Sequence, residues 1–112
     1  MNWKKLDSIG ELDKLIHESN DSPRLLFKHS TRCSISSLAL NRLKSSALAI
    51  ECFILNVIEN RDLSNLVAQQ FNTAHQSPQV LIIHKGKCIF HTSHFNISPS
   101  IVEKEINLLN EV

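Results

Sequence analysis

The chain has 112 residues, and its 12 basic and 11 acidic side chains give a formal net charge of +1. This length fits a single domain of residues 1–112 with its own core, and the near-neutral charge argues against a nucleic-acid partner. Apolar runs such as 80–83 are too short to cross a bilayer and no secretory leader follows Met1, so we expect a cytoplasmic protein without a membrane partner.

The chain begins with a short strand pattern and an amphipathic helix pattern. A strand is expected at 3–6, and Ser8 opens an S-x-x-E capping box. The polar run 20–23 ends the helix. Its apolar positions recur at helical spacing and are Ile9, Leu12, Leu15 and Ile16.

Residues 24–29 form an almost continuous apolar run of strand length, which is typical of a strand covered on both faces. Ser30 and Thr31 are candidate caps for the helix that follows. The apolar side of that helix is expected to consist of Ile35, Leu38, Ala39 and Leu43.

A second buried strand is expected at 52–57, and 60–62 offer a cap for a third helix. Strands that alternate with helices in this way predict parallel strands joined by right-handed crossovers. The apolar positions of the third helix are Leu63, Leu66, Val67 and Phe71.

The last third of the chain predicts a hairpin and a closing helix. Strands at 80–83 and 88–91 are joined by only four residues, which is too short for a crossover and requires an antiparallel pair. Ser98 and Pro99 are a cap and a proline at the first helical position. The sequence therefore predicts an α/β fold with a central mixed sheet and helices on both faces.

Cys33 is the candidate nucleophile, because it lies between the strand at 24–29 and the helix that follows. Free N–H groups and the positive end of a helix dipole favour the thiolate form, which attacks disulfides. The alternative is an inert buried thiol. The polar neighbours Thr31, Arg32 and Ser34 are candidate substrate-binding residues, and Arg32 and Lys28 are candidates for adding positive potential.

Cys52 and Cys88 are assigned other roles. The three cysteines contain no C-x-x-C pair, so they indicate neither a disulfide framework nor a zinc ribbon. Cys52 is expected in the core, and Cys88 is the alternative resolving thiol. We expect no metal site at Cys88-x-x-His91, because residues three apart on a regular strand face opposite ways.

The segment Phe27-Lys28-His29-Ser30-Thr31-Arg32-Cys33-Ser34-Ile35-Ser36, together with Ser77-Pro78 before the hairpin, resembles the monothiol bacilliredoxins of the thioredoxin superfamily. The resemblance implies a thioredoxin-like fold and a cis Ser77–Pro78 bond facing Cys33. It also places Ser36 at the position of a resolving cysteine, where its hydroxyl is a candidate donor to the thiolate or a solvated residue. Ser34 stands where the family commonly has proline.

The resemblance further implies an oxidoreductase that removes a low-molecular-weight thiol such as bacillithiol from S-thiolated client proteins. Cys33 and Ser36 are then the catalytic residues, and Ser77 and Pro78 join the substrate-binding residues. No tightly bound cofactor is expected, and bacillithiol or a similar thiol is the co-substrate. The alternatives are a non-catalytic protein-binding adaptor and a monothiol iron–sulfur carrier; the absence of a Gly-Phe pair between Cys33 and Ser36 argues against the carrier.

Overall fold

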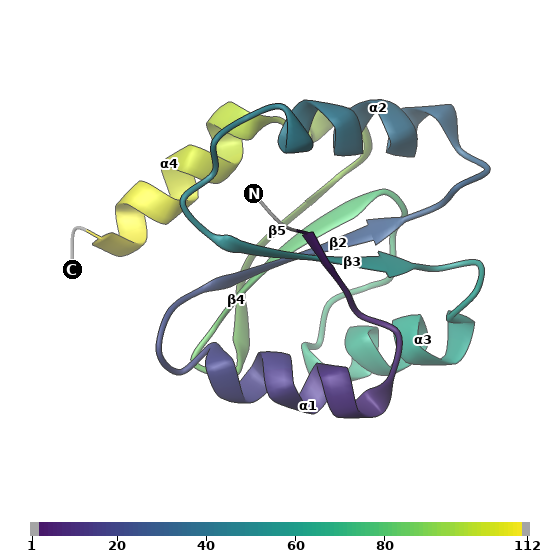
Figure 1. Ribbon diagram of the computed structural model, residues 1–112, viewed down its shortest axis with the longest axis horizontal. Coiled ribbons are helices and arrows are strands. Elements are labelled where there is room, and N and C mark those ends of the chain that lie inside the picture. The colour runs from purple at the N-terminus through teal and green to yellow at the C-terminus, as the bar shows by residue number, and fades with distance from the viewer. Residues whose placement is uncertain (1–2, 111–112) are drawn as a thin grey trace.

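The computed structural model describes residues 3–110 and consists of five strands, four α-helices and one 3-10 turn within that range (Figure 1). The predicted range 1–112 includes 1–2 and 111–112, which lie outside the described residues. The elements in chain order are β1 (Trp3–Lys5), α1 (Ile9–Glu18), β2 (Arg24–His29), α2 (Ser34–Lys44), β3 (Glu51–Asn56), α3 (Arg61–Gln70), β4 (Gln79–His84), β5 (Lys87–Ser93), the turn η1 (His94–Asn96) and α4 (Pro99–Asn110).

The strands form one mixed sheet in the order β1-β3-β2-β4-β5. β1, β3 and β2 are parallel, while β4 is antiparallel to β2 and pairs with β5 as the predicted hairpin. We call the end of the sheet where β1, β2 and β3 finish and β4 begins the carboxyl edge. The opposite end, where β4 and β5 meet in the turn at 84–87, is the hairpin edge.

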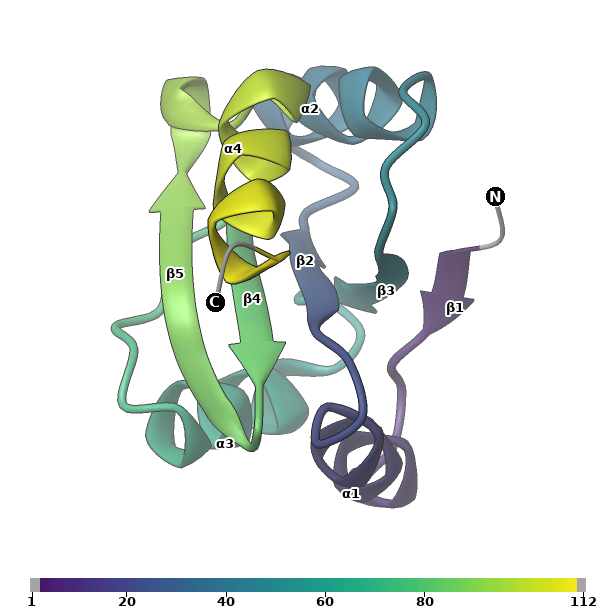
Figure 2. The same cartoon turned by 90° about the vertical axis from the view of Figure 1, so that its left-hand side faces the viewer.

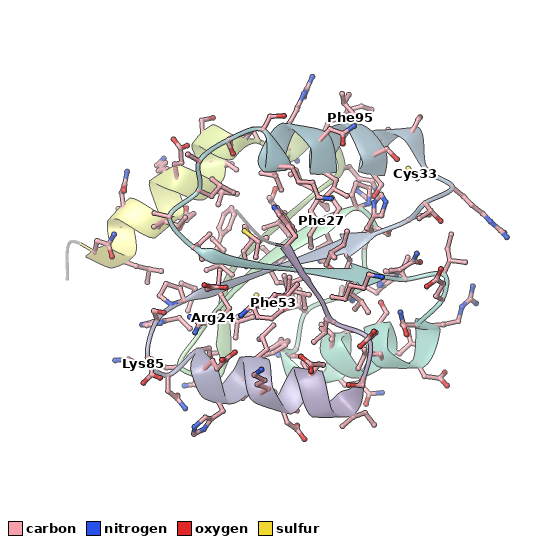
Figure 3. All side chains as sticks on the ribbon, in the orientation of Figure 1. Arg24, Phe27, Cys33, Phe53, Lys85 and Phe95 are labelled. Carbon is pink, nitrogen blue, oxygen red and sulfur yellow. The ribbon has the colours of Figure 1, made fainter. Side chains whose placement is uncertain are left out.

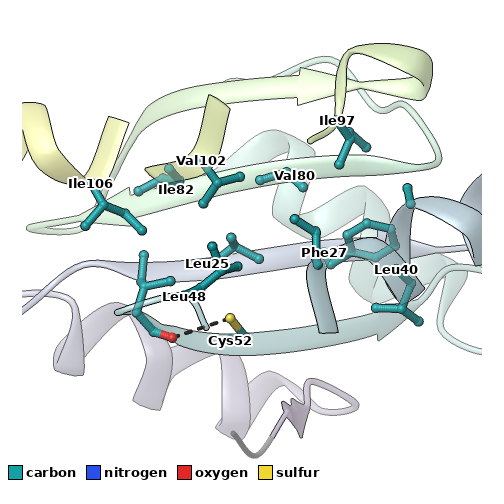
Figure 4. Packing of buried hydrophobic residues seen from close by; sticks show 13 residues of the cluster. Leu25, Phe27, Leu40, Leu48, Cys52, Val80, Ile82, Ile97, Val102 and Ile106 are labelled. Atoms are coloured by element: carbon teal, nitrogen blue, oxygen red, sulfur yellow. Dashed lines mark hydrogen bonds between the residues drawn. The ribbon is translucent and has the colours of Figure 1, made fainter. Parts of the chain in front are cut away.

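Helices cover both faces of the sheet, as predicted (Figure 2). One core cluster lies beneath α2 and α4 and includes Phe27, Val80 and Val102, with the Cys52 thiol donating to the carbonyl of Ile50 at 3.4 Å (Figure 4). The other lies beneath α1 and α3 and includes side chains from β2, β3 and β4. β2 is therefore buried from both sides, which explains its continuous apolar sequence.

Most of the predicted apolar positions of α1 and α2 face the core, but one residue of each helix does not. Ile9 is 61% exposed and Leu38 is 51% exposed, so both assignments to apolar faces were wrong. In α2 the buried positions are Ser36, Ala39, Leu40 and Leu43, which follow i, i+3, i+4 and i+7. The helix therefore buries a serine and leaves Leu38 in solvent.

The predicted helix caps were partly right. Ser8 accepts a hydrogen bond from Glu11 N at 3.1 Å, and Ser98 accepts one from Ile101 N at 3.3 Å. Ser30 and Thr31 do not cap α2, because the helix begins one turn later with Cys33 as its N-cap. Asn60 is the N-cap of α3 but makes no side-chain cap bond.

A β-bulge in the hairpin changes which residues of β5 share a face. Ile82 pairs with Phe90 while the next residue, Ile83, pairs with Cys88, so Ile89 is the extra residue. Phe90 packs against the α2–α4 cluster, whereas Cys88 packs against the α1–α3 cluster. His91, adjacent to Phe90, therefore lies on the Cys88 side, and the prediction that Cys88 and His91 face opposite ways was wrong.

Candidate active site

Cys33 lies at the carboxyl edge, in the loop that links β2 to α2, whereas Arg24 and Lys85 lie at the other end of the molecule (Figure 3). Its N–H donates to the carbonyl of Ser30 at 3.2 Å, and its own carbonyl accepts from Ser37 N at 3.1 Å, in the first turn of α2. The residue is half-buried, and its thiol makes no cap bond to the helix. Cys33 therefore lies at the start of the helix, where unpaired backbone N–H groups favour negative charge.

Ser36 lies one turn into α2 and is fully buried, so the alternative of a solvated serine was wrong. Its hydroxyl oxygen accepts from Ser30 N at 3.0 Å and lies 2.6 Å from Nδ1 of His29. With the oxygen accepting from Ser30, the hydroxyl proton is free to donate to Nδ1. Ser36 thus ties the active-site loop and the end of β2 to the helix.

His29 is the buried partner of Ser36 and was not among the candidate site residues. Burial, together with the positive charge of Lys44, lowers the pKa of its imidazole below the usual value. A neutral ring has one N–H and one acceptor nitrogen, and its tautomer decides whether Nδ1 accepts the Ser36 hydroxyl proton or donates to the hydroxyl oxygen. The signal for this role in the sequence is a histidine at the carboxyl end of a largely apolar strand.

Ser77 and Pro78 lie at the same edge, directly before β4. The bond between them is cis, as the resemblance implied. Lys28 pairs with Gln79 in the β2–β4 ladder, so Pro78 comes next to the end of β2, and its carbonyl accepts from His94 N at 3.1 Å. The Ser77 hydroxyl oxygen is buried and makes no hydrogen bond within the described residues.

Lys28 is fully buried on the face of the sheet that α3 covers, although lysine is rarely enclosed. Its ammonium donates to the carbonyl of Ser64 and to Nδ1 of His75, both at 3.1 Å. Burial lowers the pKa of Lys28 to about 8. His75 belongs to the loop before Pro78, so the lysine anchors that loop from beneath the sheet.

The remaining predicted contact residues surround the thiol from the solvent side. Thr31, Arg32 and Ser34 are all exposed. The structure thus brings the loop with Cys33 and the Ser77–Pro78 turn to one edge of the sheet, with polar side chains facing solvent around the thiol.

A protein-family model described as monothiol bacilliredoxin BrxC matches residues 4–102. The chain belongs to the monothiol bacilliredoxin family. Because the chain belongs to this thioredoxin-like family, it is a thiol redox enzyme with a single active-site cysteine.

Solved structures agree with the family's fold. A protein assigned as an oxidoreductase with a thioredoxin fold is 27% identical, with a TM-score of 0.82 and coverage of 93% of this chain and 92% of its own. Thioredoxin from Trypanosoma brucei brucei superimposes with a TM-score of 0.76 at 11% identity, over 99% and 93% of the two chains. Thioredoxin from Malassezia sympodialis gives 0.75 at 13% identity, over 96% and 90%. The two thioredoxins share the fold alone.

The other two cysteines of this family member lie away from Cys33. Cys52 is buried in β3, as predicted, and burial raises the pKa of its thiol to about 12. Cys88 lies at the hairpin edge beside Ile83, about 17 Å along β4 from Pro78 at 3.3 Å per residue. Burial raises the pKa of Cys88 above its usual value. A disulfide needs α-carbons within about 7 Å, so this placement does not support Cys88 as the resolving thiol.

Neither a metal centre nor a membrane segment emerges from residues 3–110. That part of the chain contains no group of three histidine, cysteine or acidic side chains arranged to hold a metal ion. None of its helices combines the length and the apolar character that crossing a bilayer requires.

Proposed function

We propose that this chain is a monothiol oxidoreductase that removes a low-molecular-weight thiol, such as bacillithiol, from S-thiolated client proteins through Cys33. The observation that carries the proposal is the position of Cys33 as the N-cap of α2, at the edge of the sheet that also holds the cis Ser77–Pro78 turn. Membership of the bacilliredoxin family supports the same chemistry.

The exchange needs only the cysteine and a mixed disulfide. The Cys33 thiolate attacks the sulfur of the small thiol, the sulfur–sulfur bond to the client breaks, and the client leaves as a thiolate. The products are a free client thiol and Cys33 carrying the small thiol as a new disulfide. One bond forms as another breaks, so no outside electron donor enters this step.

Release of the adduct then requires a second molecule. The hydroxyl at Ser36 cannot form a disulfide, and Cys52 and Cys88 lie in the core and at the hairpin edge. An external thiol or another redox protein must therefore attack the Cys33 adduct and free the enzyme. The Pro78 carbonyl already accepts from His94 N, and proline has no N–H to donate. The main-chain groups that can hold a client segment in extended form are therefore those of Ser77.

Intact mass spectrometry after mixing with a bacillithiolated protein tests the proposal. The wild type is expected to gain the mass of one bacillithiol while the client loses it, and Cys33→Ser is expected to show neither change. Cys88→Ser should behave as the wild type does. Transfer to Cys33→Ser at the wild-type rate, or no transfer to the wild type, would reject the proposal.

The two alternatives each give a different readout. An iron–sulfur carrier would show visible absorption after anaerobic purification, and this absorption would disappear in Cys33→Ser. A non-catalytic adaptor would alkylate at Cys33 with iodoacetamide at pH 6 no faster than a model thiol does.

A further inference from the structure

We propose that a hollow at the carboxyl edge, bounded by Thr31 and His29 of the active-site segment, binds the polar part of a low-molecular-weight thiol that carries both an amino group and a carboxylate. The inference rests on the proposed function and adds the place where the polar part of the thiol binds. The hollow has a volume of about 300 Å³, which is at the lower end of the range for small-molecule sites.

The walls of this hollow come from four segments that meet at the carboxyl edge. β1 and the residues after it contribute Lys5 and Asp7, the end of β3 contributes Asn56, and the turn before α3 contributes Glu59. Ligands of α/β proteins bind outside the carboxyl ends of parallel strands, because the loops there surround a shared crevice. The fold therefore places this hollow where such a ligand is expected.

The hollow is lined by charged groups of both signs that form no ion pair within residues 3–110. Lys5, Asp7 and Glu59 are exposed, and the one ion pair found among residues 3–110 joins Lys4 to Glu51. A carboxylate on the ligand can bond to the Lys5 ammonium, while an amino group can bond to Asp7 or Glu59. A neutral thiol such as 2-mercaptoethanol uses neither set of groups.

The hollow is close enough to Cys33 for one small molecule to occupy both. Thr31 precedes Cys33 by two residues, so their α-carbons are at most about 7.6 Å apart. The chain also turns back on itself at this point, because Cys33 N donates to the carbonyl of Ser30 at 3.2 Å. A thiol of amino-acid size attached to Cys33 can therefore place its charged groups in the hollow.

His29 links the hollow to the helix that carries the thiol. His29 lines the hollow, and its Nδ1 atom lies 2.6 Å from the buried hydroxyl of Ser36 in α2. The wall next to the ligand is thus fixed by a buried hydrogen bond rather than by a mobile side chain. A preformed wall reduces the entropy lost on binding.

Two larger hollows fit this role less well. A hollow of about 690 Å³ lies between Pro23, Leu48 and Ile106, at the opposite end of the sheet from Cys33. Another of about 450 Å³ lies between the starts of α1 and α3 and shares Asp7 and Glu59 with the proposed site. Of these three hollows, the one beside Thr31 includes residues of the active-site segment.

The test compares mixed disulfides of one client protein that differ only in the attached thiol. The four thiols are bacillithiol, which has both charged groups, cysteamine, 3-mercaptopropionate and 2-mercaptoethanol. We expect Lys5→Met to lower kcat/KM about fivefold for bacillithiol and 3-mercaptopropionate, the usual effect of one exposed ion pair. Asp7→Asn should lower kcat/KM to a similar extent for bacillithiol and cysteamine. Because Glu59 can take over the role of Asp7, the double variant Asp7→Asn/Glu59→Gln is measured as well.

The 2-mercaptoethanol disulfide and two remote variants are the controls. All the variants should process the 2-mercaptoethanol client as the wild type does, and Asp21→Asn and Lys104→Met should leave all four rates unchanged. Equal losses on all four disulfides, or no loss on any, would overturn the binding site. If the wild type cleaves none of the four, the proposed function itself fails, which is a separate outcome.

Discussion

The two edges of the sheet bury polar groups in different ways. At the hairpin edge, the Ser19 hydroxyl donates to the carbonyl of Ile16 at 2.6 Å and accepts from Gly86 N at 3.0 Å, so it bonds only to backbone. At the carboxyl edge, buried side chains bond to one another, as in the pairs Lys28–His75 and His29–Ser36. Backbone partners are fixed by the fold, whereas paired side chains must be desolvated together. We therefore expect the buried polar groups to cost more stability at the carboxyl edge, above all at Lys28.

The largest effect that separates the two edges concerns their thiols. Cys33→Ser is expected to reduce exchange with a mixed disulfide by more than about 1,000-fold, because the attacking atom is lost. Cys88→Ser should keep the rate within about twofold, because burial holds its thiol protonated at the opposite edge. Stopped-flow measurement of client thiol release checks both values. A large loss in Cys88→Ser would contradict the separation of the edges.

Lys28→Met tests the stability cost at the carboxyl edge. The pKa of Lys28 falls from 10.5 to about 8 on burial, so the unfolded chain binds more protons between these values and stability rises with pH there. The free-energy cost of burying the charged ammonium is complete below pH 8 and declines as the pH approaches 10.5. We expect the variant to be about 1 to 3 kcal/mol more stable than the wild type at pH 7, with a smaller difference at pH 10.

Urea unfolding of both proteins at the two pH values measures this difference. Subtracting the unfolding free energy of the wild type from that of the variant at each pH cancels the titration of the groups that the two proteins share. Lys28→Met is also expected to weaken activity on protein clients, because His75 loses its anchor in the loop before Pro78. A variant that is less stable at pH 7 would show that the two hydrogen bonds of the lysine outweigh its desolvation.

Serine substitutions at the two edges give the next largest effect. Ser36→Ala leaves the Ser30 N–H and Nδ1 of His29 without their partner and should cost about 2 kcal/mol of unfolding free energy. Exchange by Cys33 should also slow, because the active-site loop is no longer tied to α2. Thermal unfolding and the exchange rate are measured on the same variant. If neither changes, the hydrogen bonds of Ser36 contribute to neither stability nor exchange.

Ser19→Ala is the matched change at the hairpin edge, and we expect it to have the smallest effect. It removes the partner of Gly86 N and should cost about 1 kcal/mol, with no change in the exchange rate. The neighbouring bond from Lys85 N to the carbonyl of Ser19 at 2.9 Å remains and holds the turn. A slower exchange reaction in this variant would mean that the two edges are coupled.

The sequence predicted the parts of the fold that depend on local pattern. The apolar run at 24–29 and the four-residue link at 84–87 correspond to β2 and to the hairpin turn. The cis bond at Pro78 followed only from the family resemblance, because local sequence does not determine the isomer. Leu38 was misassigned, because periodicity identifies several possible helix faces and packing selects one.

The sequence offered candidate site residues but not the contacts that they make. Cys33, Ser77 and Pro78 stand out through their positions between elements, whereas the burial of Lys28 depends on contacts with Ser64 and His75 that are 36 and 47 residues away. The bulge at Ile89 is likewise set by the pairing of two strands and leaves no single-residue signal. Long-range packing is what a single sequence conveys least.

The enclosed hydroxyl of residue 36 has a consequence for how such enzymes diverge. Its surroundings already hold an imidazole within bonding distance and a backbone donor, so the cavity around this side chain is preformed. Exchanging oxygen for sulfur there would set a second thiol against a built-in base, three residues after the first. One-thiol and two-thiol versions of this architecture thus differ by a single atom at this position, whose larger radius the imidazole at 2.6 Å would have to accommodate.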